Sequence, residues 1–359
     1  MSALRSGRAA ALAIALAALL ATLIVLALRI GATSAIPDFR TTLHGAFAAL
    51  GFGAPLDAAS QTIVDLRLWR ALTAAGVGAS LGLAGALVQG VFRNGLASPS
   101  VLGISGGASL GAIAALLVVG GFGKHYTAPL EMTSSGLVLV PLFAFVGAIA
   151  TAFVVYRLAS TKGHVSIPAL LLIGIAVNTF FGGVQQLVQM LVIGDWEVSK
   201  SILMWSFGTL DDRESWHASV AWLGFACAAL VVPFVAWELD LMQAGLEDAE
   251  ALGVNTRRVK FLSLSAASIA AGTSVAVAGQ IAFVGLIVPH LVRLLSGTSH
   301  RTLLVLSGLA GACFLLAADV AQHAFVPRLS LQPGVVMSLV GGPFFVWLLW
   351  TKRREIAVW

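Results

Sequence analysis

The sequence has little charge and little cysteine for a chain of 359 residues. Asp, Glu, Lys and Arg make up 10% of it, whereas soluble globular domains carry roughly 25%. This low fraction excludes a soluble domain of any size, and with 58% hydrophobic residues it predicts an all-α polytopic membrane protein. The two cysteines, Cys227 and Cys313, lie inside apolar runs, which excludes a disulfide framework, and we interpret both as packing residues.

Motifs for catalysis, nucleotide binding and metal binding are also missing from the sequence. No G-x-x-x-x-G-K-[ST] motif occurs, so we expect any ATP that drives this protein to be hydrolysed on a separate subunit. Residues 103–107 match the G-x-S-x-G of hydrolases, but that motif needs a preceding strand and here begins an apolar helix. His, Cys, Asp and Glu show no metal-ligand spacing, and the basic residues are too dispersed to bind nucleic acid. We therefore expect no enzyme activity, no metal ligand and no cofactor in this chain.

Ten apolar segments fill most of the chain and are predicted to be membrane helices. The first runs from Ala9 to Leu28, which is too long for the core of a signal peptide and fits a retained spanning helix. The apolar segment at 283–296 is short for a full membrane span. The predicted helices cover about residues 9–30, 64–91, 100–120, 137–157, 168–193, 216–237, 261–279, 283–296, 302–325 and 334–351.

Basic residues are distributed unequally between the two sides of this predicted bundle. Thirteen fall on the side that carries both termini, among them Arg5, Arg8 and the run at 352–354, and seven fall on the opposite side. Loops rich in Lys and Arg stay in the cytoplasm. The sequence therefore predicts a multi-pass protein of the bacterial inner membrane with cytoplasmic N- and C-termini.

Two short stretches of the sequence repeat one pattern of small residues. Residues 78–85, GASLGLAG, and residues 272–279, GTSVAVAG, both fit G-x-S-x-x-x-A-G. They occupy the second helix of each predicted five-helix half and run in opposite directions, which is typical of an inverted-topology repeat. Small-residue matches also arise because Gly, Ala and Ser let membrane helices approach closely, so both interpretations stay open.

Residues 238–260 form a polar segment between two apolar runs, and hold eight of the 37 charged residues. Their apolar positions recur with helical spacing, which predicts one short amphipathic helix over about 241–252. Gly253 is placed to end it, because glycine adopts the left-handed cap conformation without steric cost. These apolar positions are Leu241, Met242, Leu246, Ala249 and Leu252. A solvated loop and a docking helix for a soluble partner both fit this pattern.

Several stretches resemble the iron-siderophore, haem and cobalamin permease family, the membrane subunits of type II ATP-binding-cassette (ABC) importers. NGLASPSVLGISGG and AGQIAFVGLIVPHLVR are the most specific, and the matches follow one another over nearly the whole chain. The matching stretches are 67–70, 84–111, 170–182, 251–258, 278–295 and 341–349. The resemblance implies that residues 1–359 form one permease domain of two inverted five-helix halves. It also implies a homodimer, two cytoplasmic ATPase subunits and a periplasmic substrate-binding protein as partners.

The resemblance also implies roles for particular residues. Arg67 and Arg70 match two family arginines that receive carboxylates of the binding protein, and a guanidinium grips a carboxylate with two hydrogen bonds. Anchoring of both arginines at lipid headgroups is the alternative. Residues 239–258 match the loop that docks on the ATPase, with Leu241, Met242, Leu246, Glu247, Ala249, Leu252 and Gly253 as expected coupling residues. The fifth and tenth helices and the 194–210 segment supply the expected pathway residues Asn178, Met190, Met204 and Phe344.

Two positions depart from the family pattern. Trp69 stands where a proline is usual, so we expect the second helix to enter the membrane differently. His323 stands where a third docking arginine is usual, and Arg328 is the nearby substitute that we consider.

The substrate expected from the sequence is haem, because residue types that ligate haem iron occur on the periplasmic side. These residues are His44, His125, Tyr126, Met132, Met190 and Met204. A ferric siderophore and cobalamin are the alternatives within the family. An ion-coupled secondary transporter is a more distant alternative, since it requires buried mid-membrane carboxylates and only Asp319 fits.

Overall fold

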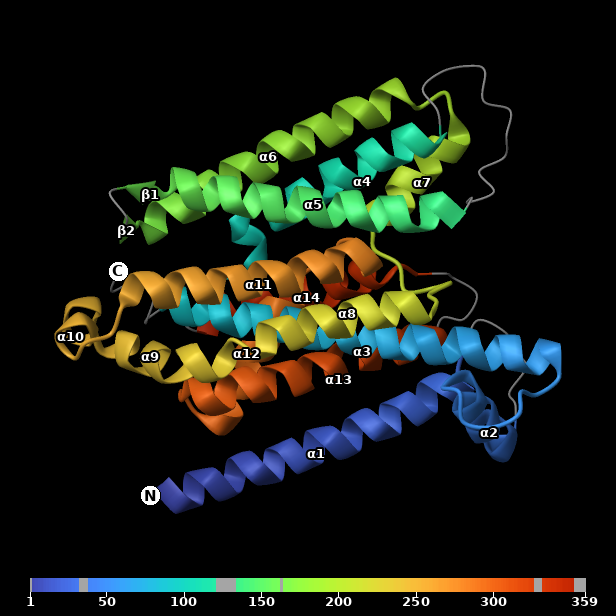
Figure 1. Cartoon of the computed structure of the whole chain (residues 1–359), viewed down its shortest axis with the longest axis horizontal. Helices are drawn as coiled ribbons and strands as arrows, with labels where there is room; N and C mark the ends of the chain where they lie inside the picture. The colour runs from blue at the N-terminus through green and yellow to red at the C-terminus, as the bar shows by residue number, and fades with distance from the viewer. Residues whose placement is uncertain (1, 32–37, 121–133, 162–163, 326–330, 352–359) are drawn as a thin grey trace.

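The computed structural model describes residues 2–31, 38–120, 134–161, 164–325 and 331–351. These residues form fourteen α-helices, one 3-10 turn and one small antiparallel hairpin (Figure 1). The helices of the first half are α1 (Ser2–Arg29), α2 (Phe39–Ala49), α3 (Ala58–Phe92), the 3-10 turn η1 (Pro99–Leu102), α4 (Ile104–Gly120), α5 (Ser134–Leu158) and α6 (Ile167–Leu191). The hairpin joins β1 (Ser160–Thr161) to β2 (His164–Val165). The later helices are α7 (Trp196–Ser206), α8 (Ser215–Ala229), α9 (Val232–Ala244), α10 (Leu246–Ala251), α11 (Thr256–Ala278), α12 (Val284–Ser296), α13 (His300–Phe325) and α14 (Pro333–Thr351).

The ten predicted membrane helices correspond to helices of the structure. Among the described residues, six helices are long and apolar enough to cross a membrane: α1, α3, α5, α6, α11 and α13. Helices α8 and α9 form a seventh span with a 53° bend, and α4, α12 and α14 are shorter apolar helices. The predicted helix over 216–237 is interrupted in the structure, because α8 ends at Ala229 and the chain restarts as α9 at Val232, with Pro233 in its first turn.

The interhelical segments contain structure that the sequence interpretation did not predict. Helix α2 lies in the segment 31–62 and α7 in the segment 194–214, and both are short. The start of α1, α10 and the β1–β2 hairpin lie at one end of the molecule, whereas α2, α7 and the start of α8 lie at the opposite end (Figure 1). This arrangement agrees with the sides assigned to these segments from the basic residues.

Helix α3 is the central helix of the bundle and is almost entirely buried. Asp57 caps its start by accepting a hydrogen bond from the Ser60 amide at 3.1 Å. The helix then continues without a break through Trp69, where the family has proline, and ends at Arg93 in the left-handed conformation (φ 52°). Thirty-five residues span about 52 Å, which exceeds a hydrocarbon core of about 30 Å. Arg67 and Arg70 consequently lie within this helix instead of at its start.

The glycines of the first repeated motif let α3 approach other helices at backbone distance. A Cβ on Gly78 would overlap the carbonyl oxygen of Gly311 in α13, and one on Gly82 would overlap that of Ser307. A Cβ on Gly85 would overlap the carbonyl of Gly285 in α12. Close contact of this kind supplies the van der Waals packing that holds membrane helices together.

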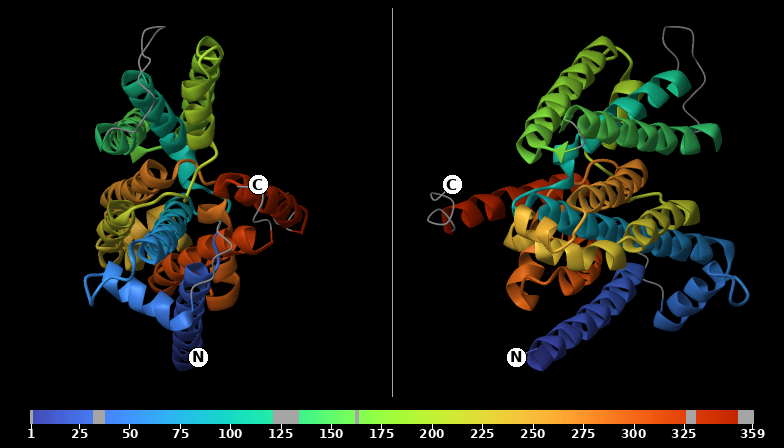
Figure 2. Two further views of the ribbon diagram at one scale, coloured as in Figure 1. Left: turned by 90° about the vertical axis from the view of Figure 1, so that its right-hand side faces the viewer. Right: turned by 60° about the vertical axis from the view of Figure 1, so that its left-hand side comes forward.

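The two halves of the bundle repeat one packing arrangement. Helix α3 packs on α12 and α13 of the second half, and α11 packs on α4 and α5 of the first half. Likewise α4 packs on α5 and α6, and α12 packs on α13 and α14. Figure 2 shows α4, α5 and α6 grouped on one side of the bundle and α1 at the other. The two repeated motifs therefore lie in equivalent helices of two inverted five-helix halves.

The repeated motif also provides a matched pair of substitutions. Gly78 and Gly272 hold its first position, but a Cβ on Gly272 would meet its neighbours at 3.5 Å, an ordinary contact. We expect Gly78→Ala to lower the free energy of unfolding by about 1–3 kcal/mol through overpacking. Gly272→Ala should leave it unchanged. Thermal unfolding of both variants in detergent measures the difference, and equal stability would contradict the packing described for α3.

Candidate coupling and docking sites

The polar segment 238–260 contains the end of α9, the whole of α10 and the start of α11, and the single helix predicted within it is divided between α9 and α10. Helix α9 extends to Ala244, Gly245 is extended (φ 170°), and α10 begins at Leu246. The Gly245 carbonyl accepts the first hydrogen bond of α10, from the Ala249 amide at 3.1 Å. Gly245 thus acts as the N-cap that divides the helix. The prediction of one helix over 241–252 is wrong, because the apolar spacing continues across this break.

Helix α10 ends at the residue that the sequence predicted. Gly253 has φ 87°, its amide donates to the Glu250 carbonyl at 2.9 Å, and the Val254 amide donates to the Ala249 carbonyl at 3.0 Å. This pair of hydrogen bonds is the Schellman motif, which favours glycine at its left-handed position. The end of α10 at Gly253 is confirmed.

The expected coupling residues divide into a buried set and an exposed set. Met242 and Ala249 are fully buried, and Leu241 and Leu246 are half-buried against the core. Glu247 and Gly253 are exposed, and the Leu252 side chain is 70% exposed. Leu252 therefore does not share the buried face. The end of the molecule instead presents a leucine beside acidic side chains, and such a surface fits a soluble partner.

Two side-chain contacts attach α9 to the core of the bundle. Asp240 accepts hydrogen bonds from the His300 amide at 2.7 Å and the Ser299 hydroxyl at 3.1 Å, and its carboxylate lies 2.8 Å from His300 Nδ1. Asp240 thereby caps the start of α13, where a negative charge is favourable. Arg93, at the end of α3, donates to the Gln243 carbonyl at 3.1 Å. A displacement of α9 and α10 therefore acts directly on α3 and α13.

The predicted docking arginines bind the C-terminal end of α1. Arg67 donates to the carbonyls of Leu28 and Arg29 at 3.2 and 3.1 Å, and Arg70 donates to the carbonyl of Ile30 at 2.8 Å. The last carbonyls of a helix have no partner within it and attract cations. Both arginines are buried, with 4% and 5% of their surface exposed. Docking at these arginines stays a prediction, and it requires opening of their contacts with α1.

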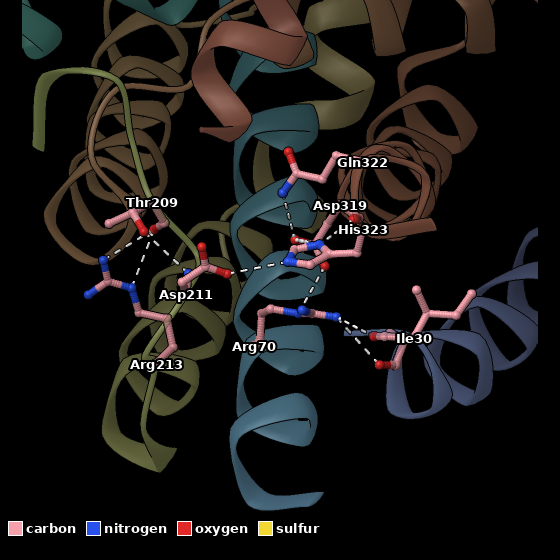
Figure 3. Close-up of polar contacts among 9 residues, drawn as sticks. Ile30, Arg70, Thr209, Asp211, Arg213, Asp319, Gln322 and His323 are labelled. Atoms are coloured by element: carbon pink, nitrogen blue, oxygen red, sulfur yellow. Dashed lines mark hydrogen bonds and ion pairs between the residues drawn. The ribbon is translucent and has the colours of Figure 1, made fainter. Parts of the chain in front are cut away.

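Arg70 also begins a network of charged side chains that joins α3, α13 and the loop before α8 (Figure 3). Its Nε lies 3.2 Å from the Asp319 carboxylate. His323 Nδ1 lies 2.8 Å from the Asp319 carbonyl, and His323 Nε2 lies 3.5 Å from the Asp211 carboxylate. His323, which stands where the resemblance places a third arginine, therefore lies beside two acidic residues. Arg328, the substitute that we considered, lies outside the described residues.

The loop before α8 contributes a second arginine beside this network. Arg213 donates to the Thr209 carbonyl at 3.2 and 3.3 Å. Burial lowers the pKa of Arg213 to about 10, so this side chain is still protonated at neutral pH. The hydrogen bond from His323 holds the pKa of Asp211 below its usual range, so Asp211 is ionised. The loop therefore carries charges of both signs at the end where α2 and α7 lie.

The four expected pathway residues lie on three different helices. Asn178 of α6 accepts from the Gly106 amide at 3.1 Å and donates to the Ser100 carbonyl at 2.7 Å, which ties α6 to the break between η1 and α4. Met190 of α6 is 74% exposed. Met204 of α7 accepts a weak hydrogen bond from the Gln332 side chain at 3.5 Å, and Phe344 of α14 packs on Trp347 with the two rings tilted by 45°. A role for these residues in the pathway stays a prediction.

Three of the six residues expected as haem ligands lie within the described part of the chain. His44 lies on α2 and Met190 and Met204 on α6 and α7. His125, Tyr126 and Met132 lie outside the described residues. Within the part of the chain that the structure describes, no three His, Cys, Asp or Glu side chains gather as metal ligands.

The arrangement of the helices is that of the membrane subunit of an ABC transporter. A solved structure, described as a metal-chelate type ABC transporter in an inward-facing conformation, matches 94% of this chain and 98% of its own, with TM-score 0.77 and 26% identity. The sequence model of the FecCD transport family matches residues 19–351. The chain therefore belongs to the FecCD transport family, and ATP is hydrolysed on another subunit.

Relatives that are named for different substrates have similar identity to this chain. The cobalamin import system permease protein of Halobacterium salinarum is 39% identical over 86% of this chain and 78% of its own. The hemin transport system permease protein of Yersinia pestis is 36% identical over 83% of this chain and 86% of its own. The Fe(3+) dicitrate transport system permease protein of Escherichia coli is 35% identical over 81% and 86%. These relatives agree with the family assignment, and their names refer to several different substrates.

The buried Arg70–Asp319 pair yields a stability prediction. Arg70→Met leaves the Asp319 carboxylate buried without its arginine partner. We expect the free energy of unfolding to fall by about 3–5 kcal/mol. Adding Asp319→Asn removes that charge and should recover part of the loss, although both variants lack the bonds from Arg70 to α1. Thermal unfolding in detergent ranks the variants by stability. Asp212 is exposed, so Asp212→Asn serves as a control that should unfold like the unsubstituted protein. Equal stability of the single and double variants would contradict a charge-based role for the pair.

Proposed function

We propose that this chain is the membrane-spanning permease subunit of an ATP-driven, binding-protein-dependent importer for an iron chelate, with haem as the substrate. The observation that carries the proposal is the surface of α10, which is exposed at the end of the bundle and fixed to α3 and α13 through α9. Haem is supported by the hemin relative at 36% identity and by the exposed methionines. Cobalamin is the second candidate, because a cobalamin relative has 39% identity.

The transport cycle follows from the two ends of the molecule. Two ATPase subunits bind the α10 surfaces of a homodimer and approach each other when they bind ATP. Their movement displaces α10 and α9, and the Asp240–His300 and Arg93–Gln243 contacts carry it to α13 and α3. The membrane helices then alternate between outward and inward openings, and the substrate biases this change only through its different affinity for the two states.

The homodimer is supported by the outer helices of the bundle. Helix α6 is apolar but mostly exposed, and it carries exposed polar side chains such as Gln186. An exposed amide is unfavourable in lipid and favourable against a second subunit or in a water-filled pathway. We place the pathway between two copies, with Asn178, Met190, Met204 and Phe344 along it.

The orientation in the bacterial inner membrane is part of the proposal. The start of α1, α10 and the β1–β2 hairpin share one end, which we assign to the cytoplasm with both termini (Figure 1). The substrate-binding protein approaches the opposite end. Its carboxylates bind Arg67 and Arg70 after these leave the α1 carbonyls, with Arg328 as a third contact.

An ion-coupled secondary transporter is a poorer fit to the structure. Its mid-membrane carboxylate would have to be Asp319, which is bound to Arg70 at 3.2 Å and flanked by His323. A carboxylate neutralised by a fixed arginine is a poor proton or sodium carrier.

Uptake into reconstituted vesicles tests the proposed function. The chain is reconstituted with its ATPase, and its binding protein is added with haem, a ferric siderophore or cobalamin in turn. We expect ATP-dependent accumulation of haem alone. Accumulation of another chelate would replace haem as the substrate and keep the importer assignment. ATP hydrolysis without accumulation of any of the three would contradict an iron-chelate or cobalamin cargo.

The contact between α9 and α13 yields a prediction about coupling. Asp240→Ala removes the cap of α13, and we expect uptake to fall about tenfold while the ATPase still binds, because charge-assisted hydrogen bonds are lost. Asp240→Asn keeps an oxygen acceptor for the His300 amide and should keep most uptake. Uptake and ATP hydrolysis are measured on the same vesicles. Equal uptake by Asp240→Ala and the unsubstituted protein would contradict transmission through this contact.

A further inference from the structure

A groove lies between the end of α5 and the start of α11 and has a volume of about 470 Å³. We call it the α5–α11 groove. Its lining includes three basic and three aromatic side chains: Phe153, Tyr156, Arg157, Arg257, Arg258 and Phe261. No residue that lines it is acidic. The groove shares Asn255, Arg257 and Arg258 with the segment 239–258 that the resemblance assigns to the ATPase, whereas its α5 wall and Phe261 lie outside that segment.

The three arginines concentrate positive charge at the mouth of the groove. Arg157 lies in the last turn of α5, and Arg257 and Arg258 lie in the first turn of α11. Their guanidinium groups form no hydrogen bond or ion pair with the residues that the structure describes. Three arginines in one groove that no acidic side chain lines favour an anion, and an arginine fork suits phosphate.

The walls of the groove are aromatic on the side toward the membrane. Phe153 lies one turn before Arg157 in α5, and Phe261 lies one turn after Arg257 in α11. These two rings are 61% and 49% exposed. The rings of Tyr156 and Phe261 meet edge to face with centroids 5.8 Å apart. The groove therefore joins a basic mouth to apolar walls within two membrane helices.

We propose that the α5–α11 groove binds one anionic phospholipid, with its phosphate on Arg157, Arg257 and Arg258. Its acyl chains lie along Phe153 and Phe261. Basic pockets between membrane helices at the cytoplasmic end bind anionic headgroups. An acidic segment of a soluble protein would pair with the arginines but would not contact the aromatic walls on the membrane side. The amphiphilic ligand uses both parts of the groove.

Native mass spectrometry of the purified full chain in detergent tests the proposal. Phosphatidylglycerol and phosphatidylcholine are titrated separately, and the number of bound lipids is counted. We expect one phosphatidylglycerol to bind at least about tenfold more tightly than phosphatidylcholine, given three arginines at the surface. Equal affinity for the two lipids would overturn the proposal.

Charge-matched variants locate the lipid. Arg157→Gln/Arg257→Gln/Arg258→Gln should lose the preference for phosphatidylglycerol, whereas Arg5→Gln/Arg8→Gln/Arg40→Gln, with the same change in net charge, should keep it. Phe153→Gln provides a second test that leaves all three arginines in place, and we expect weaker binding of both lipids. Unchanged lipid preference in the first variant would overturn the site.

Competition separates the lipid from other anions. We expect inorganic phosphate at millimolar concentration to leave the bound phosphatidylglycerol in place, because it lacks the acyl chains. Displacement by phosphate would make this a small-anion site and overturn the proposal. Release of the lipid on addition of the ATPase subunit would assign the groove to that protein instead and would likewise overturn it.

Discussion

Contact between helix backbones around α3 is the constraint on which the rest of the structure depends. Gly78, Gly82 and Gly85 bring α3 against the carbonyls of α12 and α13 with no room for a side chain. In a membrane this packing replaces the hydrophobic effect as the force between helices. Because α3 is nearly fully buried, its neighbours take their positions from it.

Helix α3 carries charged side-chain contacts in its first half and at its end. In the first half of α3, Arg67 and Arg70 bind the end of α1 and Arg70 also pairs with the Asp319 carboxylate, whereas Arg93 at the end of α3 binds α9. One rigid helix thus connects the region predicted to receive the binding protein with the region predicted to meet the ATPase. We expect α3 and α13 to respond to both partners. The aromatic and basic α5–α11 groove lies outside this connection.

Much of the fold could be predicted from the sequence, because a bilayer requires long apolar helices and basic loops mark one side. The end of α10 was also predictable, since Gly253 supplies the left-handed residue that the cap needs. The break at Gly245 was not, because apolar positions on either side keep the same period. The burial of Arg67 and Arg70 and the contact of Asp240 with His300 depend on residues far apart in the chain, and no local pattern records them.

The measurement that tests the central claim most directly is hydrogen–deuterium exchange of the chain with and without its ATPase. We predict slower exchange on ATPase binding at residues 245–253, with the β1–β2 hairpin little changed. Faster or unaltered exchange at 245–253, together with protection elsewhere on the molecule, would contradict the assignment of α10 as the coupling surface.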